Sequence, residues 1–190
     1  MKLPATTWQT VGPYFRIGLA ALYRTELAAP QNKGERITVQ GRVLDGLGHP
    51  VPDAVLELWQ ADAHGSYFPQ SNEVDKELGA DVFFGFGRIP TDAGGSFHFS
   101  TIKPGQVPGP GGTKQAPHIV VSLFMRGLLI RLVTRIYFLN DPSNRQDPVL
   151  NLVEPARQST LMAVPVDGNP HLLQWNVVLQ GEYETVFFNF

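Results

Sequence analysis

The sequence of 190 residues contains no cysteine, which excludes disulfide bonds, thiolate metal sites and cysteine nucleophiles. Only 17% of the residues are charged and the formal net charge is -2, so no basic excess indicates nucleic-acid binding. The longest apolar runs, such as 119–121, are too short to span a bilayer, and residues 1–10 lack the apolar segment of a secretory signal. We therefore expect a cytoplasmic protein that binds neither a membrane nor a nucleic acid.

Glycine and proline are frequent, at 19 and 16 residues, and they separate the apolar segments in the way typical of all-β proteins. The best helix candidate is 155–163, because Pro155 suits a first helical turn. We expect a β-sandwich of mostly antiparallel strands with long functional loops, an N-terminal arm and one short helix. Strands are predicted at 35–43, 54–60, 96–101, 118–125, 134–138, 172–180 and 184–188.

Three segments do not follow the strand pattern, namely 1–34, 61–88 and 103–117. Long loops in a compact sandwich usually carry function. We divide the chain into an N-terminal arm, residues 1–34, which we expect to contact a partner chain, and a sandwich domain, residues 35–190.

The start of the strand predicted at 118–125 raises the question of a metal site. His118 and Val120 are two residues apart and therefore face the same side of a strand. Histidine at both positions would make a plausible ligand pair, but valine cannot bind a metal. A single histidine at a strand start is more often structural than a ligand, and Tyr67 is ordinarily interpreted as a packed loop aromatic. From these residues alone the evidence for a metal is weak.

Several motifs in a fixed order change this interpretation. They are Trp-Gln-Ala-Asp at 59–62, Gly-Arg at 87–88, Thr-Asp at 91–92 and Lys-Pro-Gly at 103–105. With these motifs, almost the whole chain resembles the intradiol ring-cleaving dioxygenases. The resemblance implies a non-haem ferric ion, held in the family's catalytic chains by two tyrosinates and two histidines, and a catecholic substrate beside whose diol carbons dioxygen is inserted. Phenolate oxygens suit a hard, highly charged ion.

The resemblance implies four metal-ligand positions in this sequence, at Tyr67, Val107, His118 and Val120. One phenolate and one imidazole remain, and valine has no lone pair to donate. The arginine that catalytic chains place three residues before the first histidine matches Gln115. We therefore expect that this chain binds no metal, and that Tyr67 and His118 are remnants of a metal site.

Within the family, the arm and the C-terminal tail resemble those of alpha chains rather than beta chains. The resemblance implies a hetero-oligomer in which a beta chain holds Fe(III), and a small aromatic dihydroxy acid as the substrate. We expect this chain alone to be inactive and its residues Thr10, Gly12, Pro13 and Tyr14 to help wall the partner's pocket. A Gly-Pro step lets backbone approach a flat ring closely. The alternative is that this stretch only anchors the arm.

Arg135 stands where catalytic chains have glutamine. Its guanidinium can pair with a carboxylate through two parallel hydrogen bonds, so we expect it to contact the substrate or the pocket edge. The alternative is an ordinary ion pair on a strand surface. For the whole chain, two other interpretations stay open: a non-catalytic module that binds aromatic acids, and a purely structural partner of a catalytic chain.

Overall fold

The computed structural model describes residues 6–12, 14–67 and 83–189. The strands in these ranges are β1 (Arg36–Leu44), β2 (Val55–Gln60), β3 (Phe86–Pro90), β4 (Ser96–Ile102), β5 (Val107–Pro108), β6 (Lys114–Gln115), β7 (His118–Phe124), β8 (Leu132–Phe138), β9 (Met162–Val166), β10 (Asn169–Gln174) and β11 (Val177–Val178). The helical segments are α1 (Tyr14–Ile17) and the 3-10 helices η1 (Ala20–Leu22), η2 (Pro110–Gly112), η3 (Pro142–Gln146), η4 (Leu150–Leu152) and η5 (Pro155–Leu161). No helix in the described ranges is long and apolar enough to cross a membrane.

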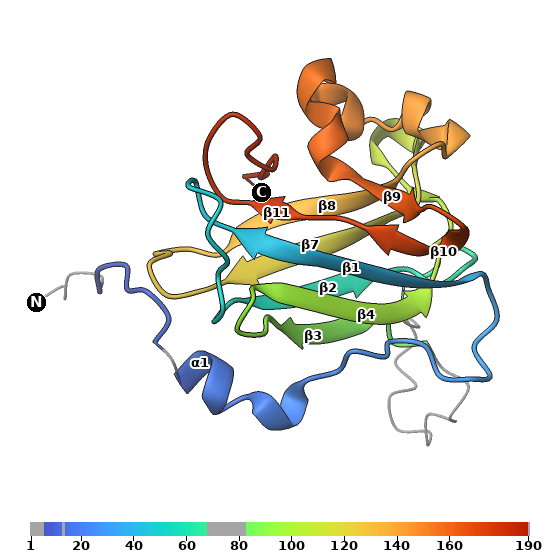
Figure 1. Ribbon diagram of the computed structural model, residues 1–190. Helices are drawn as coiled ribbons and strands as arrows, with labels where there is room; N and C mark the ends of the chain where they lie inside the picture. The colour runs from blue at the N-terminus through green and yellow to red at the C-terminus, as the bar shows by residue number, and fades with distance from the viewer. Residues whose placement is uncertain (1–5, 13, 68–82, 190) are drawn as a thin grey trace, which may run out of the picture.

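The strands form a β-sandwich whose two layers share β9. One layer has the order β3-β2-β7-β8-β9, and the other has the order β4-β1-β10-β9, with β11 beside the end of β1. Neighbouring strands are antiparallel except for the pairs β1–β10, β1–β11 and β8–β9. Figure 1 shows the layer of β1, β4 and β10 in front of the layer of β2, β7 and β8. The predicted β-sandwich of mostly antiparallel strands is confirmed.

The main core fills the space between the layers. On β7, Ile119, Val121 and Leu123 are fully buried, and they belong to the same apolar cluster as Val39 on β1 of the other layer. Burying each such side chain contributes about 1.5–3 kcal/mol. Since side chains alternate along a strand, the remaining β7 residues, beginning with His118, face away from this core. The outer face of the β2–β7–β8 layer therefore carries the predicted site.

Residues 24–27 close the open side of the sandwich. The backbone N–H of Arg24 donates to the carbonyl oxygen of Arg88 on β3 at 3.0 Å, and that of Leu27 donates to the carbonyl oxygen of Ser100 on β4 at 2.9 Å. The Leu27 side chain is fully buried in the core. Figure 1 shows this part of the blue arm running below the sandwich. One short segment therefore covers an edge strand of each layer, where backbone groups would otherwise be open to pairing.

Two of the predicted strands differ in the structure. The segment 172–180 is interrupted between β10 and β11, where the backbone N–H of Trp175 donates to the carbonyl oxygen of Gln40 at 2.9 Å. The segment 184–188 forms no strand of its own. Its residue Phe188 makes an isolated bridge to Val133 of β8, so the tail lies beside this strand without extending the sheet.

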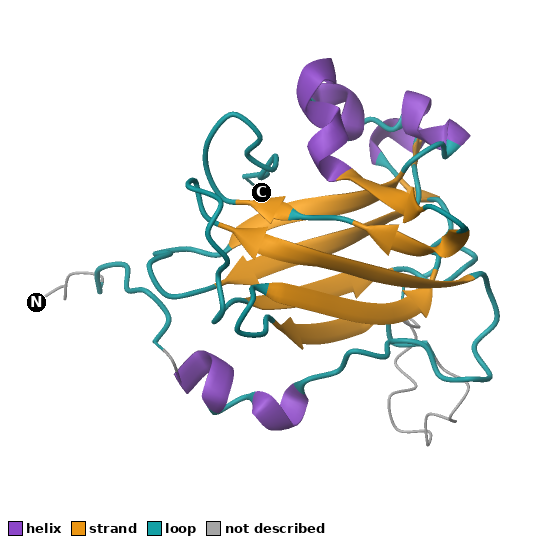
Figure 2. Cartoon of the chain, viewed as in Figure 1, coloured by secondary structure: helices purple, strands orange, loops and turns teal. Residues whose placement is uncertain are grey.

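The predicted helix at 155–163 is helical only over Pro155–Leu161, as the 3-10 helix η5, and β9 begins at Met162. More helical segments are present than the one predicted. Figure 2 shows them outside the strands, with α1 and η1 in the arm on one side of the sandwich and η3–η5 on the opposite side. β3 lies partly in the segment 61–88, for which no strand was predicted.

Candidate functional site

Two loops that pack backbone against backbone carry Tyr67 and Val107. Asp62 shapes the first loop, since its Oδ1 accepts hydrogen bonds from two backbone N–H groups at 2.8 and 2.9 Å. Gly65 has a φ of +81°, and a Cβ there would lie 1.8 Å from the carbonyl oxygen of Gln106 in the second loop. Only glycine permits this approach. The contact fixes the Tyr67 loop against the loop that leads to Val107.

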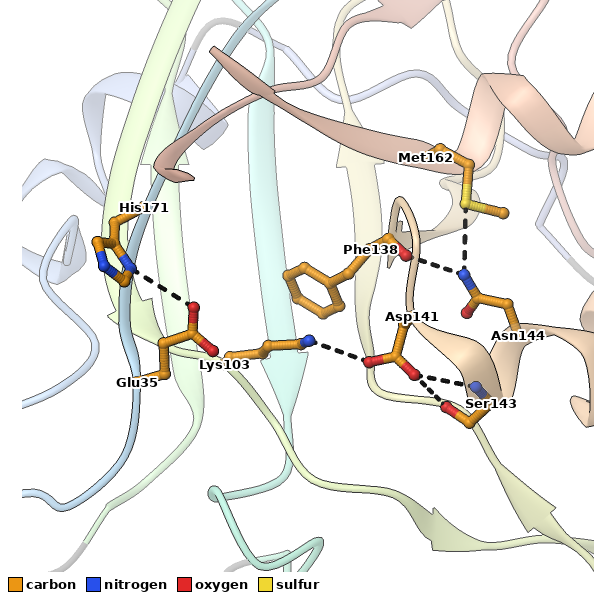
Figure 3. Close-up of polar contacts among 8 residues, drawn as sticks. All are labelled: Glu35, Lys103, Phe138, Asp141, Ser143, Asn144, Met162 and His171. Atoms are coloured by element: carbon orange, nitrogen blue, oxygen red, sulfur yellow. Dashed lines mark hydrogen bonds and ion pairs between the residues drawn. The ribbon is translucent and has the colours of Figure 1, made fainter. Parts of the chain in front are cut away.

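Lys103, from the Lys-Pro-Gly motif, anchors the second loop to the end of β8. Its Nζ lies 3.0 Å from Oδ2 of Asp141 and 5.4 Å from the ring centroid of Phe138 (Figure 3). Asp141 also accepts a hydrogen bond from the backbone N–H of Ser143 at 3.1 Å. Burial raises the pKa of Asp141, but the hydrogen bonds from Ser143 and Lys103 outweigh it, and the pKa lies below its ordinary value. The motif thus positions the loop through a partly buried ion pair.

The outer face of β7 and β8 brings predicted site residues together. His118 lies directly opposite Tyr137, and Val120 lies directly opposite Arg135. On the other side of β7, Trp59 of β2 is paired with Val120. Residues paired in this way have adjacent side chains on one face of a sheet. Trp59, Val120 and Arg135 therefore form a continuous row across three strands.

Tyr67 and Val107 lie at the border of this row. The ring of Tyr67 stacks on Trp59, with ring centroids 6.0 Å apart and planes 2° apart. Burial raises the pKa of Tyr67, and the positive charge of Arg135 opposes that rise, so the guanidinium acts on the phenol. Val107 is buried and is paired with Gln115 between β5 and β6. The structure thus gathers the predicted ligand positions around one face.

Arg135 is only 8% exposed and is held by the chain's own residues. Its Nη1 donates to Oε1 of Gln115 at 2.7 Å and to the hydroxyl of Tyr137 at 3.2 Å. The guanidinium also lies 5.9 Å from the ring centroid of Phe188. The resemblance implies an arginine at position 115 and a glutamine at position 135 in catalytic chains. In this chain Gln115 and Arg135 are in contact.

His118 is buried and neutral. Its Nδ1 lies 2.7 Å from the carbonyl oxygen of Ala116, so we assign the ring proton to Nδ1, which donates to that oxygen. Burial, followed by the positive charge of Arg135, lowers the pKa of His118 to about 4, although the hydrogen bond to Ala116 and the charge of Asp147 oppose this. At neutral pH the ring therefore carries no charge.

Sequence reasoning missed two residues of this face, Tyr137 and Asp147, which are both fully buried. Asp147 Oδ1 accepts from the Tyr137 hydroxyl at 3.2 Å and from two backbone N–H groups at 2.7 and 2.8 Å, and its Oδ2 accepts from the backbone N–H of Ala116 at 2.6 Å. Burial raises the pKa of Tyr137, so its phenol stays protonated. Tyr137 shares a strand face with Arg135, and this alternation was a usable signal. Asp147 lies in a loop without a pattern that would single it out.

The side chains present do not fit a ferric ion. Tyr67 and His118 provide one phenol oxygen and one imidazole nitrogen, whereas Val107 and Val120 provide only alkyl groups. The positive charge of Arg135 already acts on both remaining donors. A trivalent cation needs more donors and more negative charge than this face provides. In the parts of the chain that the structure describes, no group of three or more His, Cys, Asp or Glu side chains is placed to hold a metal ion.

The arm residues lie at the opposite end of β7 from His118. Oγ1 of Thr10 accepts a hydrogen bond at 2.7 Å from a backbone N–H in the turn between β7 and β8. Gly12 precedes α1, Tyr14 in α1 is 79% exposed, and Pro13 lies outside the described residues. A seven-residue strand such as β7 spans about 20 Å. Within one chain, the structure therefore does not bring the arm residues to Arg135.

Comparison with known proteins identifies the family. A family model described as "Dioxygenase" matches residues 10–181. The chain belongs to this family, the intradiol ring-cleaving dioxygenases. It is 44% identical over 204 residues to the protocatechuate 3,4-dioxygenase alpha chain of Pseudomonas putida, with 99% of this chain and 98% of that chain covered.

Two further relatives extend the comparison. The protocatechuate 3,4-dioxygenase beta chain of Burkholderia cepacia is 40% identical over 159 residues, which cover 80% of this chain and 67% of that chain. Among solved structures, the dioxygenase domain of a dioxygenase carbohydrate-binding protein fusion from Streptomyces sp. SirexAA-E has a TM-score of 0.64 and 28% identity, covering 86% of this chain and 89% of that one. The family resemblance predicted from the motifs is confirmed.

Proposed function

We propose that this chain is the alpha subunit of a two-chain protocatechuate 3,4-dioxygenase whose beta chain holds Fe(III). The complex would open the ring of 3,4-dihydroxybenzoate between its two hydroxyl-bearing carbons, adding both atoms of O2 to give 3-carboxy-cis,cis-muconate. Similarity to an alpha chain over nearly the full length, and the existence of a separate beta-chain relative, support a hetero-oligomer. The observation that carries the proposal is the pairing of Val120 with Arg135, an alkyl group and a guanidinium on a face where iron would need donors.

In this proposal Arg135 recognises the carboxylate that protocatechuate carries opposite its diol. A guanidinium makes two parallel, charge-assisted hydrogen bonds to a carboxylate, and burial strengthens them. Trp59, which belongs to the same row as Arg135, is 42% exposed, and the half-buried ring of Tyr67 stacks on it, which provides aromatic surface near the charge. Tyr67 and His118 then have structural roles.

The arm, residues 1–34, contacts the beta chain in this proposal, and Thr10, Gly12, Pro13 and Tyr14 contribute to the wall of its pocket. Two features support this role. The side chain of Tyr14 is 79% exposed, and a Cβ at Gly12 would meet no atom within 4 Å. The chain's own fold therefore makes little use of these surfaces, which are open to a neighbour.

Co-expression with a beta chain tests the proposal. We expect one ferric ion per alpha–beta pair, cleavage of protocatechuate only by the pair, and no stoichiometric iron in this chain purified alone. Stoichiometric ferric ion in the isolated chain, with a phenolate charge-transfer colour, would contradict it. A beta chain that is fully active alone would make this chain a structural partner. A monomer that binds aromatic acids without a beta chain would indicate a binding module.

A further inference from the structure

A row of polar groups leads from the interior of the domain to Arg135. It begins at Asp147, whose carboxylate is fully buried and is fixed by three backbone N–H groups. The hydroxyl of Tyr137 donates to Oδ1 of Asp147 at 3.2 Å, and its oxygen accepts from Nη1 of Arg135, also at 3.2 Å. The hydroxyl is thus donor on one side and acceptor on the other, and it links the anion to the cation.

The same Nη1 has a second acceptor in Gln115, whose Oε1 lies 2.7 Å away. The side chain of Gln115 is itself oriented, because its Nε2 donates to the carbonyl oxygen of Pro108 at 3.0 Å. Both hydrogens of Nη1 therefore have a protein acceptor. Two fixed acceptors define the position and the plane of the guanidinium, which otherwise sits at the end of a flexible side chain.

The hydroxyl of Tyr137 is not needed for packing. Its ring lies in a buried cluster with Ala116, Leu150 and Leu161, where phenylalanine would fill the same space. Burying a hydroxyl is unfavourable unless it is hydrogen-bonded. The hydroxyl of Tyr137 is compensated for its burial by hydrogen bonds with Asp147 and Arg135. We therefore infer that the hydroxyl contributes by connecting these two side chains.

We propose that Tyr137 and Asp147 are positioning residues that hold the guanidinium of Arg135, together with Gln115, in the orientation that receives the substrate carboxylate. This inference rests on the proposed function, because it assumes that Arg135 contacts the substrate. Neither Tyr137 nor Asp147 contacts the substrate in this proposal. They act on affinity through Arg135 and leave the chemistry at the diol unchanged.

The test uses the complex with the beta chain and the variant Tyr137→Phe, which removes only the linking hydroxyl. We expect the KM for protocatechuate to rise about three- to tenfold, as for the loss of one hydrogen bond of ordinary strength. We expect kcat to stay within about twofold and the KM for catechol, which lacks the carboxylate, to stay unchanged. Tyr183→Phe, at a 72% exposed position, is the matched control and should change neither constant.

Gln115→Met removes the other acceptor of Nη1 at a partly exposed position, and we expect the same selective rise in KM. This variant decides the question if Tyr137→Phe does not fold. Equal rises for protocatechuate and catechol would show a merely structural role and overturn the inference. If Arg135→Gln raises the KM for protocatechuate selectively but neither acceptor variant does, the positioning role is wrong and the proposed function stands. If Arg135→Gln affects both substrates equally, its proposed contact with the substrate is itself wrong.

Discussion

The two ends of β7 are built differently. At its start, His118 is buried opposite Tyr137 of β8, and the guanidinium of Arg135, two residues before Tyr137, is hydrogen-bonded to other residues of the chain. At its end, the ring of Phe124 packs on Phe15 of the arm at 4.9 Å between centroids, and the neighbouring Tyr14 is largely exposed. The first end is defined by buried polar contacts. The second end is defined by an aromatic contact next to an exposed side chain.

This difference separates two kinds of functional surface. At the Arg135 end, the chain itself fixes the geometry, so a substitution there should change the chain's own stability or the affinity of the complex for substrate. At the arm end, the exposed groups contribute little to the chain's own fold, so a substitution should act only when a partner is present. Four variants test this contrast.

The largest effect is expected for Asp147→Ala. The change removes a buried carboxylate and leaves Tyr137 and three backbone N–H groups without their acceptor. We expect the free energy of unfolding to fall by about 3–5 kcal/mol, measured by urea denaturation. Asp92→Ala, whose Oδ1 accepts from two backbone N–H groups in an exposed turn, is the control and should cost about 1 kcal/mol. Equal losses would mean that the Arg135 end is no more tightly organised than an ordinary surface turn.

The next effect depends on pH and on His118. Its pKa in the folded chain, about 4, lies below the ordinary value of 6.5 for histidine, so the unfolded chain binds the proton first as the pH falls. Stability should therefore decrease between pH 6.5 and pH 4, by about 3 kcal/mol over the whole range. The stability of His118→Gln should not show this part of the decrease. The measurement is the urea midpoint at a series of pH values from about 7.5 to about 4. His98→Gln, on the exposed face of β4, should keep the wild-type slope, and identical slopes for all three proteins would contradict the prediction.

The hydrogen-bonded pair of Arg135 and Gln115 allows a test of substrate binding. Arg135→Gln should raise the KM of the complex for protocatechuate about 10- to 30-fold and change the KM for catechol much less. Because the two side chains are hydrogen-bonded, adding Gln115→Arg should return a guanidinium to nearly the same place and restore part of the affinity. Arg42→Gln, on the outer face of the other layer, is the control. A double variant with a KM for protocatechuate as high as that of Arg135→Gln would show that a guanidinium at position 115 cannot replace the one at position 135.

The smallest effect is expected at the arm. Gly12→Ala adds a methyl group where no atom of the chain lies within 4 Å, so the free energy of unfolding of this chain alone should change by less than about 0.5 kcal/mol. In the complex, we expect kcat/KM to fall about three- to tenfold, because the methyl group would meet the substrate or the wall of the partner's pocket. An unchanged kcat/KM would place Gly12 away from the pocket and weaken the contrast between the two ends.

Much of the fold could be predicted from the sequence because alternation fixes which residues of a strand share a face. The contact between Arg135 and Val120 follows from two adjacent strands of this kind. Asp147 could not be found in this way, because loop geometry brings its carboxylate to Ala116 and Tyr137.

Besides the two-residue strands β5 and β6, two longer strands were not predicted, and each has a physical reason. In β3, a Cβ at Gly87 would lie 2.7 Å from Cδ1 of Leu27, so contact with the arm favours glycine where a strand usually has a large side chain. In β9, Ala163 and Pro165 interrupt the pattern of β-branched residues. The 3-10 helix η5 directly precedes β9, so the helix predicted at 155–163 extends into the first residues of the strand. In both cases a neighbouring segment, rather than local propensity, decides the structure.

The attachment of residues 24–27 to both sheet edges limits how the arm can be used. A neighbouring molecule that contacts the chain before Arg24 can leave this attachment in place. Before Arg24 the arm contacts the sandwich through side chains, since the ring of Phe15 packs on Phe124 and Nη2 of Arg16 donates to the carbonyl oxygen of Thr91 at 3.0 Å. A partner that displaced these side-chain contacts would leave the pairing of residues 24–27 with β3 and β4 in place, so both edges would stay covered against unwanted strand pairing.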